Sequence, residues 1–387
     1  MDNSELKLRR DKIRALMEKR DIDAALITCN VNLLYTVGRI VSGYLYLPVD
    51  APAHFFMKRS HMPEGNRIHA LRKPEQISGM LDAMGIAAPR RLMLEADELS
   101  HTDYLRLAAC FPQAKIENAT PLIRQARSIK THYEIELFRR SGIMHAWAYG
   151  RIPSAYRPGM TDRDLSIEVE RVMRQEGCLG IFRTFGQSME IFMGSLLTGD
   201  NAGIPSPYDF ALGGEGLDPS LPVGANGTPL RAGQTVMVDM GGNFFGYLSD
   251  MSRTFTIGQV SQKVIDAHSV CLEIEEEMMY HAAPGTVCET LYDNALRLAE
   301  QHGFADRFMG TARHAGFVGH GIGLEINEPP VLAPRMKQEL EEGMVFAFEP
   351  KIIMPGVGPV GIENSWLVTS DGVERLTPGA GTMVPLG

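Results

Sequence analysis

The chain has 387 residues, of which 44% are hydrophobic and 22% are charged, and it carries a formal net charge of −9 at pH 7. This composition is typical of a globular protein with a sizeable apolar core, and the length predicts two or three domains. The negative charge argues against nucleic acid and anionic membranes as partners, because both require a basic surface.

The cysteines and the N-terminal segment indicate the cellular compartment in which we expect the protein. The five cysteines are scattered and form no CxxC pair, which indicates reduced thiols. The first 20 residues form a charged amphipathic pattern without the apolar centre of a signal peptide. No apolar run reaches the roughly 18 residues that a membrane helix needs. We therefore expect a cytoplasmic protein without a membrane partner.

The N-terminal third alternates helix and strand patterns. Apolar residues at helical spacing predict a helix over residues 5–20. Four apolar runs predict strands: "DAALIT" (23–28), "NLLYTVG" (32–38), "HFFM" (54–57) and "RLMLEA" (91–96). This alternation indicates a small α/β domain. We place its end near residue 127, where a polar, basic stretch leads into a new helix from about residue 133.

Two stretches further along resemble each other. Residues 158–177 and 284–303 each begin with Pro-Gly, hold one amphipathic helix and end in Gly. Thr161 and Asp164 predict a capping box for the first helix, and Gly177 and Gly303 suit helix ends. The apolar faces are formed by Leu165, Val169 and Val172 and by Leu291, Ala295 and Leu298. We favour an internal duplication that gives two α/β halves facing a cleft, although one weak similarity also arises by chance.

Residues 199–235 are dense in Gly, Pro and Asn. This pattern predicts a long loop or a series of turns. Loops of this length inside a domain are often functional, and a surface excursion without chemistry is equally compatible with the sequence.

Acidic residues recur in the apolar stretches that follow. Asp239 ends an apolar run and Asp250 precedes another, with "GGNFFG" as the turn of a hairpin that brings them together. Glu349 and Glu363 lie in apolar, β-like runs, and His320 follows the strand-like "HAGFV". Each alone is compatible with a satisfied core residue. Four buried carboxylates together, with Arg253 and Lys351 as the only basic residues in those strands, favour a metal centre.

The order Asp239, Asp250, His320 in "GHGIGLE", Glu349 in "FEP" and Glu363 in "GIEN" resembles the metal ligands of the pita-bread metallopeptidases, peptidase family M24. This family includes methionine aminopeptidase, Xaa-Pro aminopeptidase, prolidase and creatinase. The resemblance covers nearly the whole chain. It implies an α/β (α+β) protein with a creatinase-type N-terminal domain over residues 1–127. A pita-bread catalytic domain with duplicated half-domains would cover residues 128–387.

The resemblance also implies a centre of two divalent ions. Asp239 would bind one ion, Asp250 and Glu363 would bridge both, and His320 and Glu349 would complete the second. The oxygen-rich ligand set favours Mn²⁺, with Fe²⁺, Co²⁺ or Zn²⁺ as alternatives. A metal-bridged hydroxide would attack an amide carbonyl, and Glu349 would take the proton from water. The glycines beside His320 would let the backbone pass close to the ions.

The substrate side departs from the peptidase pattern. Relatives have histidines where this chain has Ser206, Gly316 and Asn327, and often an arginine where it has Gly361. Ser206 and Asn327 keep hydrogen-bonding groups but carry no proton near pH 7, and they are our candidate substrate contacts beside Glu349. His314 could partly replace a lost histidine, although we favour a structural role for it. Arg313 could bind a substrate carboxylate, although we favour a surface position for it.

Three functions are compatible with these features. The first is a metal-dependent Xaa-Pro dipeptidase or aminopeptidase acting on a short peptide. The second is an M24 enzyme acting on a small non-peptide molecule by hydrolysis or lyase chemistry. The third, a silent binding module, is disfavoured by the complete ligand set.

The resemblance further implies a homodimer in which Tyr44 and Tyr46 reach the partner's active site, unless they pack in their own sheet.

Overall fold

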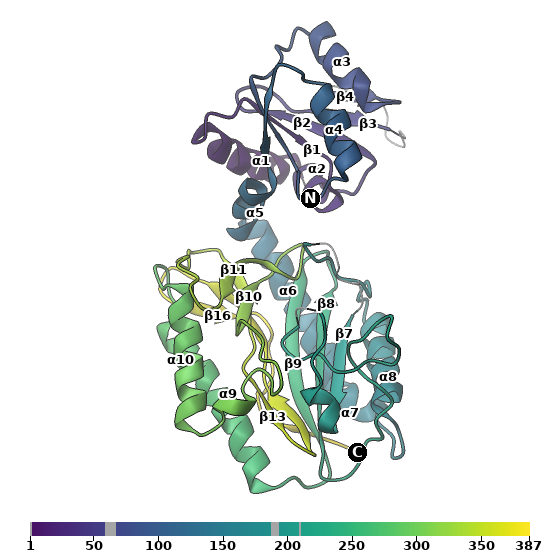
Figure 1. Cartoon of the computed structure of the whole chain (residues 1–387), viewed down its shortest axis with the longest axis vertical. Helices are drawn as coiled ribbons and strands as arrows, with labels where there is room; N and C mark the ends of the chain where they lie inside the picture. The colour runs from purple at the N-terminus through teal and green to yellow at the C-terminus, as the bar shows by residue number, and fades with distance from the viewer. Residues whose placement is uncertain (1, 59–66, 187–192, 209) are drawn as a thin grey trace. The chain divides into compact units, whose positions relative to one another are not determined.

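The computed structural model describes residues 2–58, 67–186, 193–208 and 210–387 of the chain. Two compact units follow one another along the sequence, Met1–Arg127 and Ser128–Gly387 (Figure 1). The division lies at the position that the change in sequence pattern marks.

The N-terminal unit is built on one mixed sheet with the strand order β4-β3-β2-β1-β5-β6. Its strands are β1 (Ala24–Ile27), β2 (Gly43–Pro48), β3 (His54–Met57), β4 (Ile68–Ala70), β5 (Arg91–Leu94) and β6 (Lys115–Asn118). Its helices are α1 (Asn3–Glu18), α2 (Asn30–Val37), η1 (Pro74–Gln76), α3 (Ile77–Ala83), α4 (His101–Ala109) and α5 (Thr120–Ser128). The predicted first helix and the strands at "DAALIT", "HFFM" and "RLMLEA" are confirmed.

The strand predicted at "NLLYTVG" is wrong, because these residues belong to helix α2. A buried carboxylate explains the difference. Glu95 accepts hydrogen bonds from the backbone N–H groups of Thr28 and Cys29 at 2.6 and 2.8 Å, at the start of the helix. Gly38 closes the other end with a left-handed φ of 85°. Tertiary contacts from residues distant in sequence therefore override the strand preference of a short apolar run.

Tyr44 and Tyr46 of β2 pack inside their own unit. Their exposed fractions are 5% and 2%, and both belong to the core beneath the sheet. The ring of Tyr46 stacks on Phe111 with 6.3 Å between centroids. The expectation that these tyrosines extend to a partner subunit is therefore wrong, and the packing alternative holds.

The C-terminal unit contains two helix-covered halves. In the first, α6 (His132–Gly150), α7 (Ile152–Ala155) and α8 (Asp162–Gln175) pack on a sheet with the order β17-β9-β8-β7. Its strands are β7 (Gly194–Thr198), β8 (Thr235–Asn243), β9 (Leu248–Ile257) and β17 (Val384–Leu386). The predicted helix after the boundary is thus α6.

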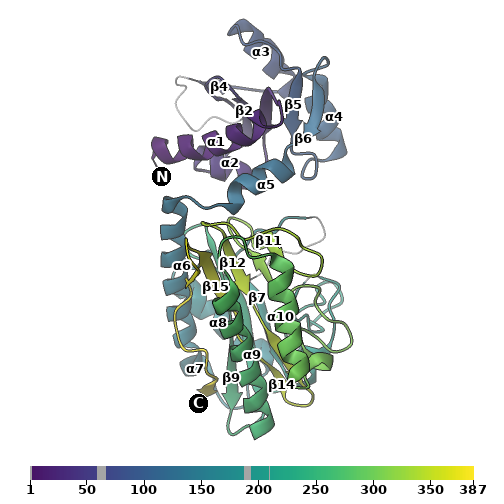
Figure 2. The same cartoon turned by 90° about the vertical axis from the view of Figure 1, so that its left-hand side faces the viewer.

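The second half places α9 (Gln262–His281) and α10 (Cys288–Gln301) on a sheet with the order β11-β10-β12-β15-β16 and on the hairpin β13-β14. Its strands are β10 (Gly319–Gly321), β11 (Glu328–Leu332), β12 (Val345–Phe348), β13 (Lys351–Met354), β14 (Gly358–Gly361), β15 (Asn364–Val368) and β16 (Val373–Arg375). Figure 1 shows α9 and α10 on the opposite flank of this unit from α8, with strands between them, and Figure 2 shows α6, α9 and α10 running alongside the strands. An origin by duplication stays a prediction.

The helices inside the two similar stretches begin and end as predicted. Thr161 and Asp164 form the capping box of α8, and Gly177 and Gly303 adopt φ of 97° and 73° after α8 and α10. The apolar faces named from the sequence are buried. The 199–235 segment contains one short 3₁₀ helix, η2 (Gly199–Gly203), and otherwise consists of turns and irregular structure over its described residues. Another short 3₁₀ helix, η3 (Ala305–Arg307), follows α10.

Within the described ranges, no helix combines the length and the apolar character that crossing a bilayer requires.

Candidate metal centre

A cavity of about 320 Å³ opens in the C-terminal unit, and the five predicted ligands line it. The remaining described residues of its wall are Phe182, Phe185, Gly194, Ser195, Phe210, Ala211, Gly241, Phe317, Ile326, Asn327 and Val331. The polar end is thus made of carboxylates and one imidazole, and aromatic and aliphatic groups form most of the rest. This combination of an apolar wall with a few convergent polar groups is typical of a small-molecule site.

The hairpin β8–β9 carries the two aspartates. Asp239 pairs with Ser252, and Asp250 pairs with Gly241, so the aspartates lie on one face in diagonal positions. The strands continue to Asn243 and resume at Leu248, so the turn is shorter than the predicted "GGNFFG" and comprises residues 244–247. The predicted juxtaposition of the aspartates is nevertheless present.

His320 lies within β10, between β11 and β12, and the strand predicted at "HAGFV" is absent. Its glycine neighbours allow this close packing. A Cβ at Gly319 would lie 2.4 Å from the carbonyl oxygen of Ala347, and one at Gly321 would lie 2.1 Å from that of Pro329. The approach of neighbouring strands therefore requires these glycines, and the expected clearance for metal ions stays a prediction.

Glu349 and Glu363 lie at junctions between strands rather than inside them. Glu349 follows β12 and precedes β13, whereas Glu363 follows β14 and precedes β15. Both are buried, at 3% and 1% exposure. A junction lets the side chain turn into the cavity while the flanking strands keep their own pairing.

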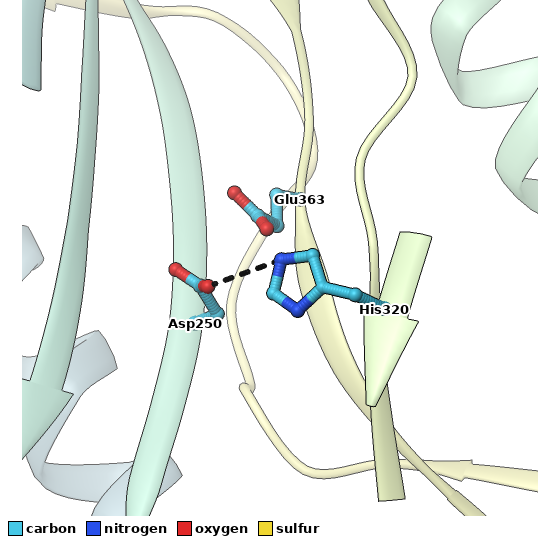
Figure 3. Close-up of side chains that lie close together, drawn as sticks. All are labelled: Asp250, His320 and Glu363. Atoms are coloured by element: carbon cyan, nitrogen blue, oxygen red, sulfur yellow. Dashed lines mark ion pairs between the residues drawn. The ribbon is translucent and has the colours of Figure 1, made fainter. Parts of the chain in front are cut away.

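The ligand atoms form two compact groups that share Glu363. One group is Asp250, His320 and Glu363, and the other is Asp239, Glu349 and Glu363, with the ligand atoms of each group within 4.8 Å of one another. Figure 3 shows Asp250 projecting from β9 toward His320 of β10 and toward Glu363 at the junction of β14 and β15. The His320 Nε2 lies 3.7 Å from Asp250 Oδ2 and 3.4 Å from Glu349 Oε1.

Hydroxyl and guanidinium groups that do not line the cavity hold these ligands through hydrogen bonds. Ser252 Oγ donates to Glu363 Oε2 at 2.6 Å, and Arg253 Nη1 donates to the Glu363 carbonyl oxygen at 2.8 Å. Ser365 Oγ donates to the carbonyl oxygen of Asp250 and accepts from its N–H, both at 2.9 Å. Such supporting hydrogen bonds fix the orientation of metal ligands.

Lys351 lies among the ligands, and the sequence does not reveal this position because Lys351 there is one of two basic residues in these strands. Its fully buried ammonium lies 2.7 Å from Asp239 Oδ2, 2.5 Å from Glu349 Oε2 and 3.4 Å from Glu363 Oε2. Burial opposes its charge, but these three carboxylates outweigh burial and raise the pKa of Lys351 well above its ordinary value. Burial also disfavours ionised Glu349, yet Lys351 and His320 lower the pKa of Glu349 to about 2.

The other group has negative charge in excess. Burial raises the pKa of Asp250 to about 7, against the favourable charge of His320 and with repulsion from Asp239 and Glu349. Burial and the charges of Asp250 and Glu349 raise the pKa of Glu363 well above its ordinary value. Burial thus outweighs the nearby positive charges of His320 and Lys351, and a divalent cation would stabilise the ionised carboxylates. The Asp250–His320–Glu363 group therefore fits a metal ion, whereas Lys351 already occupies the second group.

The proposed substrate contacts divide between two pockets. Asn327 lines the metal-side cavity, and its amide is paired with the backbone of Phe185, accepting from the N–H at 2.7 Å and donating to the carbonyl at 2.8 Å. Ser206 lines a different pocket and donates to the carbonyl oxygen of Pro222 at 2.8 Å. The walls of the two pockets share Phe210 and Ala211, and the role of Ser206 as a substrate contact stays a prediction. Gly316 borders the same second pocket as Ser206.

His314 and Arg313 do not replace the missing histidines. The His314 ring pairs through Nδ1 with the carbonyl oxygen of Phe308 at 2.7 Å, and the residue lines the Ser206 pocket. His314 lies outside β10, so it does not share a strand with His320. Arg313 is exposed, in agreement with its assignment as a surface residue.

Comparison with known proteins supports the resemblance seen in the sequence. Residues 136–370 match the metallopeptidase family M24, and residues 9–129 match the creatinase/prolidase N-terminal domain. An Xaa-Pro dipeptidase of Pyrococcus furiosus is 24% identical over 384 residues, which cover 96% of this chain and 98% of that protein. An uncharacterized peptidase of Bacillus subtilis is 26% identical over 376 residues, covering 95% and 97%.

A solved structure has the same fold. The Xaa-Pro dipeptidase from Bacillus anthracis superposes with a TM-score of 0.80 at 24% sequence identity, covering 98% of this chain and 100% of that one. The predicted fold class, a creatinase-like N-terminal domain followed by a catalytic domain of the pita-bread type, is confirmed.

Proposed function

This chain belongs to the metallopeptidase family M24, and we propose that it is a metal-dependent hydrolase that cleaves an amide bond in a small substrate. The observation that carries the proposal is the convergence of Asp250, His320 and Glu363 at the wall of a cavity large enough for a dipeptide-sized molecule. Xaa-Pro dipeptides are the first substrates to test, because relatives that align over nearly the whole chain are Xaa-Pro dipeptidases.

The residues of the centre have distinct roles in this proposal. Asp250, His320 and Glu363 would hold the ion, which supplies the Lewis acidity that polarises the scissile carbonyl and activates water near neutral pH. Glu349 lines the cavity, and its carboxylate would accept the proton that the attacking water gives up. The apolar wall of the cavity excludes bulk water from the reacting groups.

A second candidate is a small amide that is not a peptide. Among the described residues of the cavity wall, His320 is the only basic side chain, so no arginine or lysine there faces a substrate carboxylate. Asn327 is already engaged with the backbone of Phe185. Phe182, Phe185, Phe210 and Phe317 offer aromatic surface instead. These features favour a substrate with an apolar or cationic group over a free dipeptide carboxylate.

Manganese is the first ion to test, because a site dominated by carboxylate oxygens suits Mn²⁺. The homodimer and the cytoplasmic location stay predictions. Light scattering at micromolar concentration tests the dimer, and a monomer with full activity would contradict a site shared between subunits.

A substrate screen tests the function. The protein loaded with Mn²⁺ is incubated with Xaa-Pro dipeptides, with Pro-containing tripeptides and with small non-peptide amides. We expect hydrolysis that a chelator abolishes and that Glu349→Gln reduces strongly, with folding checked by circular dichroism. Cleavage of only the non-peptide amides would select the second candidate. Hydrolysis that persists in metal-free protein would refute the metal-dependent mechanism.

A further inference from the structure

The ammonium of Lys351 lies where an ion of the second ligand group would lie. Its Nζ contacts one oxygen from each of the three members of that group, Asp239, Glu349 and Glu363, at 2.7, 2.5 and 3.4 Å. A lysine ammonium has three N–H donors, and three carboxylates surround it. The group thus has the coordination that a small cation would have, with the cation supplied by the chain.

An ion and the ammonium cannot share this position. Divalent transition metals bind carboxylate oxygens at about 2.0–2.2 Å, so an ion held by the same three oxygens would overlap Nζ. Two cations that close would also repel strongly in a buried site. The second ion that the family resemblance implies therefore does not fit while Lys351 keeps this conformation.

The backbone holds Lys351 in place. Lys351 pairs with Gly361 across the β13–β14 hairpin, and its side chain is 0% exposed. A Cβ at Gly361 would lie 2.5 Å from the carbonyl oxygen of Pro350 and 3.1 Å from Lys351 Cγ. Glycine at position 361 thus lets β14 lie close to the backbone of Pro350 and Lys351.

We propose that Lys351 replaces one of the two metal ions, so that the centre binds a single divalent ion through Asp250, His320 and Glu363 with the ammonium as a built-in second cation. This inference rests on the proposed metal-dependent function. It changes the role of Asp239, which becomes the partner of Lys351 instead of a metal ligand.

Metal counting tests the inference. Wild-type protein is equilibrated with excess Mn²⁺, freed of unbound ion and analysed for metal content. We expect one ion per chain in wild type and two in Lys351→Met, which removes the charge at nearly constant volume. Lys130→Met is the matched control, because Lys130 is also buried and bound to a carboxylate, Glu328, but lies outside the centre. Its count should stay at one.

Two measurements keep the test decisive if Lys351→Met fails to fold. Asp250→Asn should lose the ion, whereas Asp239→Asn should keep it. The electron paramagnetic resonance spectrum of wild-type protein with Mn²⁺ should show the hyperfine pattern of an isolated ion rather than that of an exchange-coupled pair.

The outcomes separate the two proposals. Two ions in wild type, or a folded Lys351→Met that still binds one, would overturn the role of Lys351 and leave the metal-dependent function standing. Loss of the ion in Asp239→Asn would also overturn it. Wild-type protein that binds no ion at all would refute the proposed function itself.

Discussion

Replacing Asn327 by histidine restores the residue that peptidase relatives have at this position, and we expect little or no gain in Xaa-Pro hydrolysis. The structure provides the reason. The Asn327 amide spans both backbone groups of Phe185, with hydrogen bonds of 2.7 and 2.8 Å. The two nitrogens of an imidazole point in divergent directions, so a histidine can replace at most one of these bonds.

The expected cost follows from these two bonds. Each contributes about 0.5–1.5 kcal/mol net, so losing one or both lowers the free energy of unfolding by about 0.5–3 kcal/mol. If the wild-type chain had merely lost a catalytic donor, restoring it would raise the rate by about 10²–10³. The two interpretations thus differ by orders of magnitude for activity.

Urea unfolding and Xaa-Pro hydrolysis are measured for Asn327→His and for the control Asn327→Ala, which removes both bonds without adding a ring. We expect the stability of the histidine variant to lie between those of wild type and the alanine variant. Adding Ser206→His should bring no further activity, because Ser206 lies in the other pocket. A gain of a hundredfold or more on a Pro-containing dipeptide would refute this reasoning, as would an alanine variant as stable as wild type.

Three further predictions concern supporting residues. Lys130→Met should lower the free energy of unfolding by about 3–5 kcal/mol in urea titrations, because it leaves the Glu328 carboxylate buried without its ammonium at 3.0 Å. Burial lowers the pKa of His145 from 6.5 to about 3, so the unfolded chain binds more protons between these pH values and stability falls as pH drops through this window. His145 should lower the free energy of unfolding by about 2 kcal/mol at pH 5 relative to pH 8. The difference between the stability profiles of wild type and His145→Gln against pH should show this loss. Parallel profiles would contradict the low pKa of His145. Ser252→Ala removes a 2.6 Å hydrogen bond to Glu363 and should weaken Mn²⁺ binding about 10–100-fold by calorimetry, whereas unchanged affinity would argue against Glu363 as a ligand.

The sequence is informative about the centre because its chemistry depends on residue type and order. Two aspartates around a hairpin and a histidine between glycines converge as the pattern predicts. The local backbone structure around the ligands is less predictable. Glu349 and Glu363 lie at strand junctions, and the glycines beside His320 serve the packing of three strands. Both depend on pairings between distant segments.

Lys351 and Ser206 show where a single sequence stops being informative. The direction of the Lys351 side chain follows from the pairing of β13 with β14, which no local pattern specifies. Ser206 lies in an irregular segment whose path is set by turns, so its position in the chain does not predict its pocket. Helix α2 differs from the predicted strand for a related reason. The buried Glu95 that accepts hydrogen bonds at the start of this helix lies at the end of a strand distant in sequence.

The buried ammonium also bears on how such an enzyme copes with changing metal supply. A cation attached to the backbone cannot be removed by a chelator or exchanged for a competing ion. Asp239 and Glu349 keep their counter-charge even in a chain that has never met a metal, so this half of the cluster is assembled during folding. With the single ion that we propose, loading would require only one successful encounter with an ion. Activity would then follow the occupancy of one site, without the steeper dependence that filling two positions imposes.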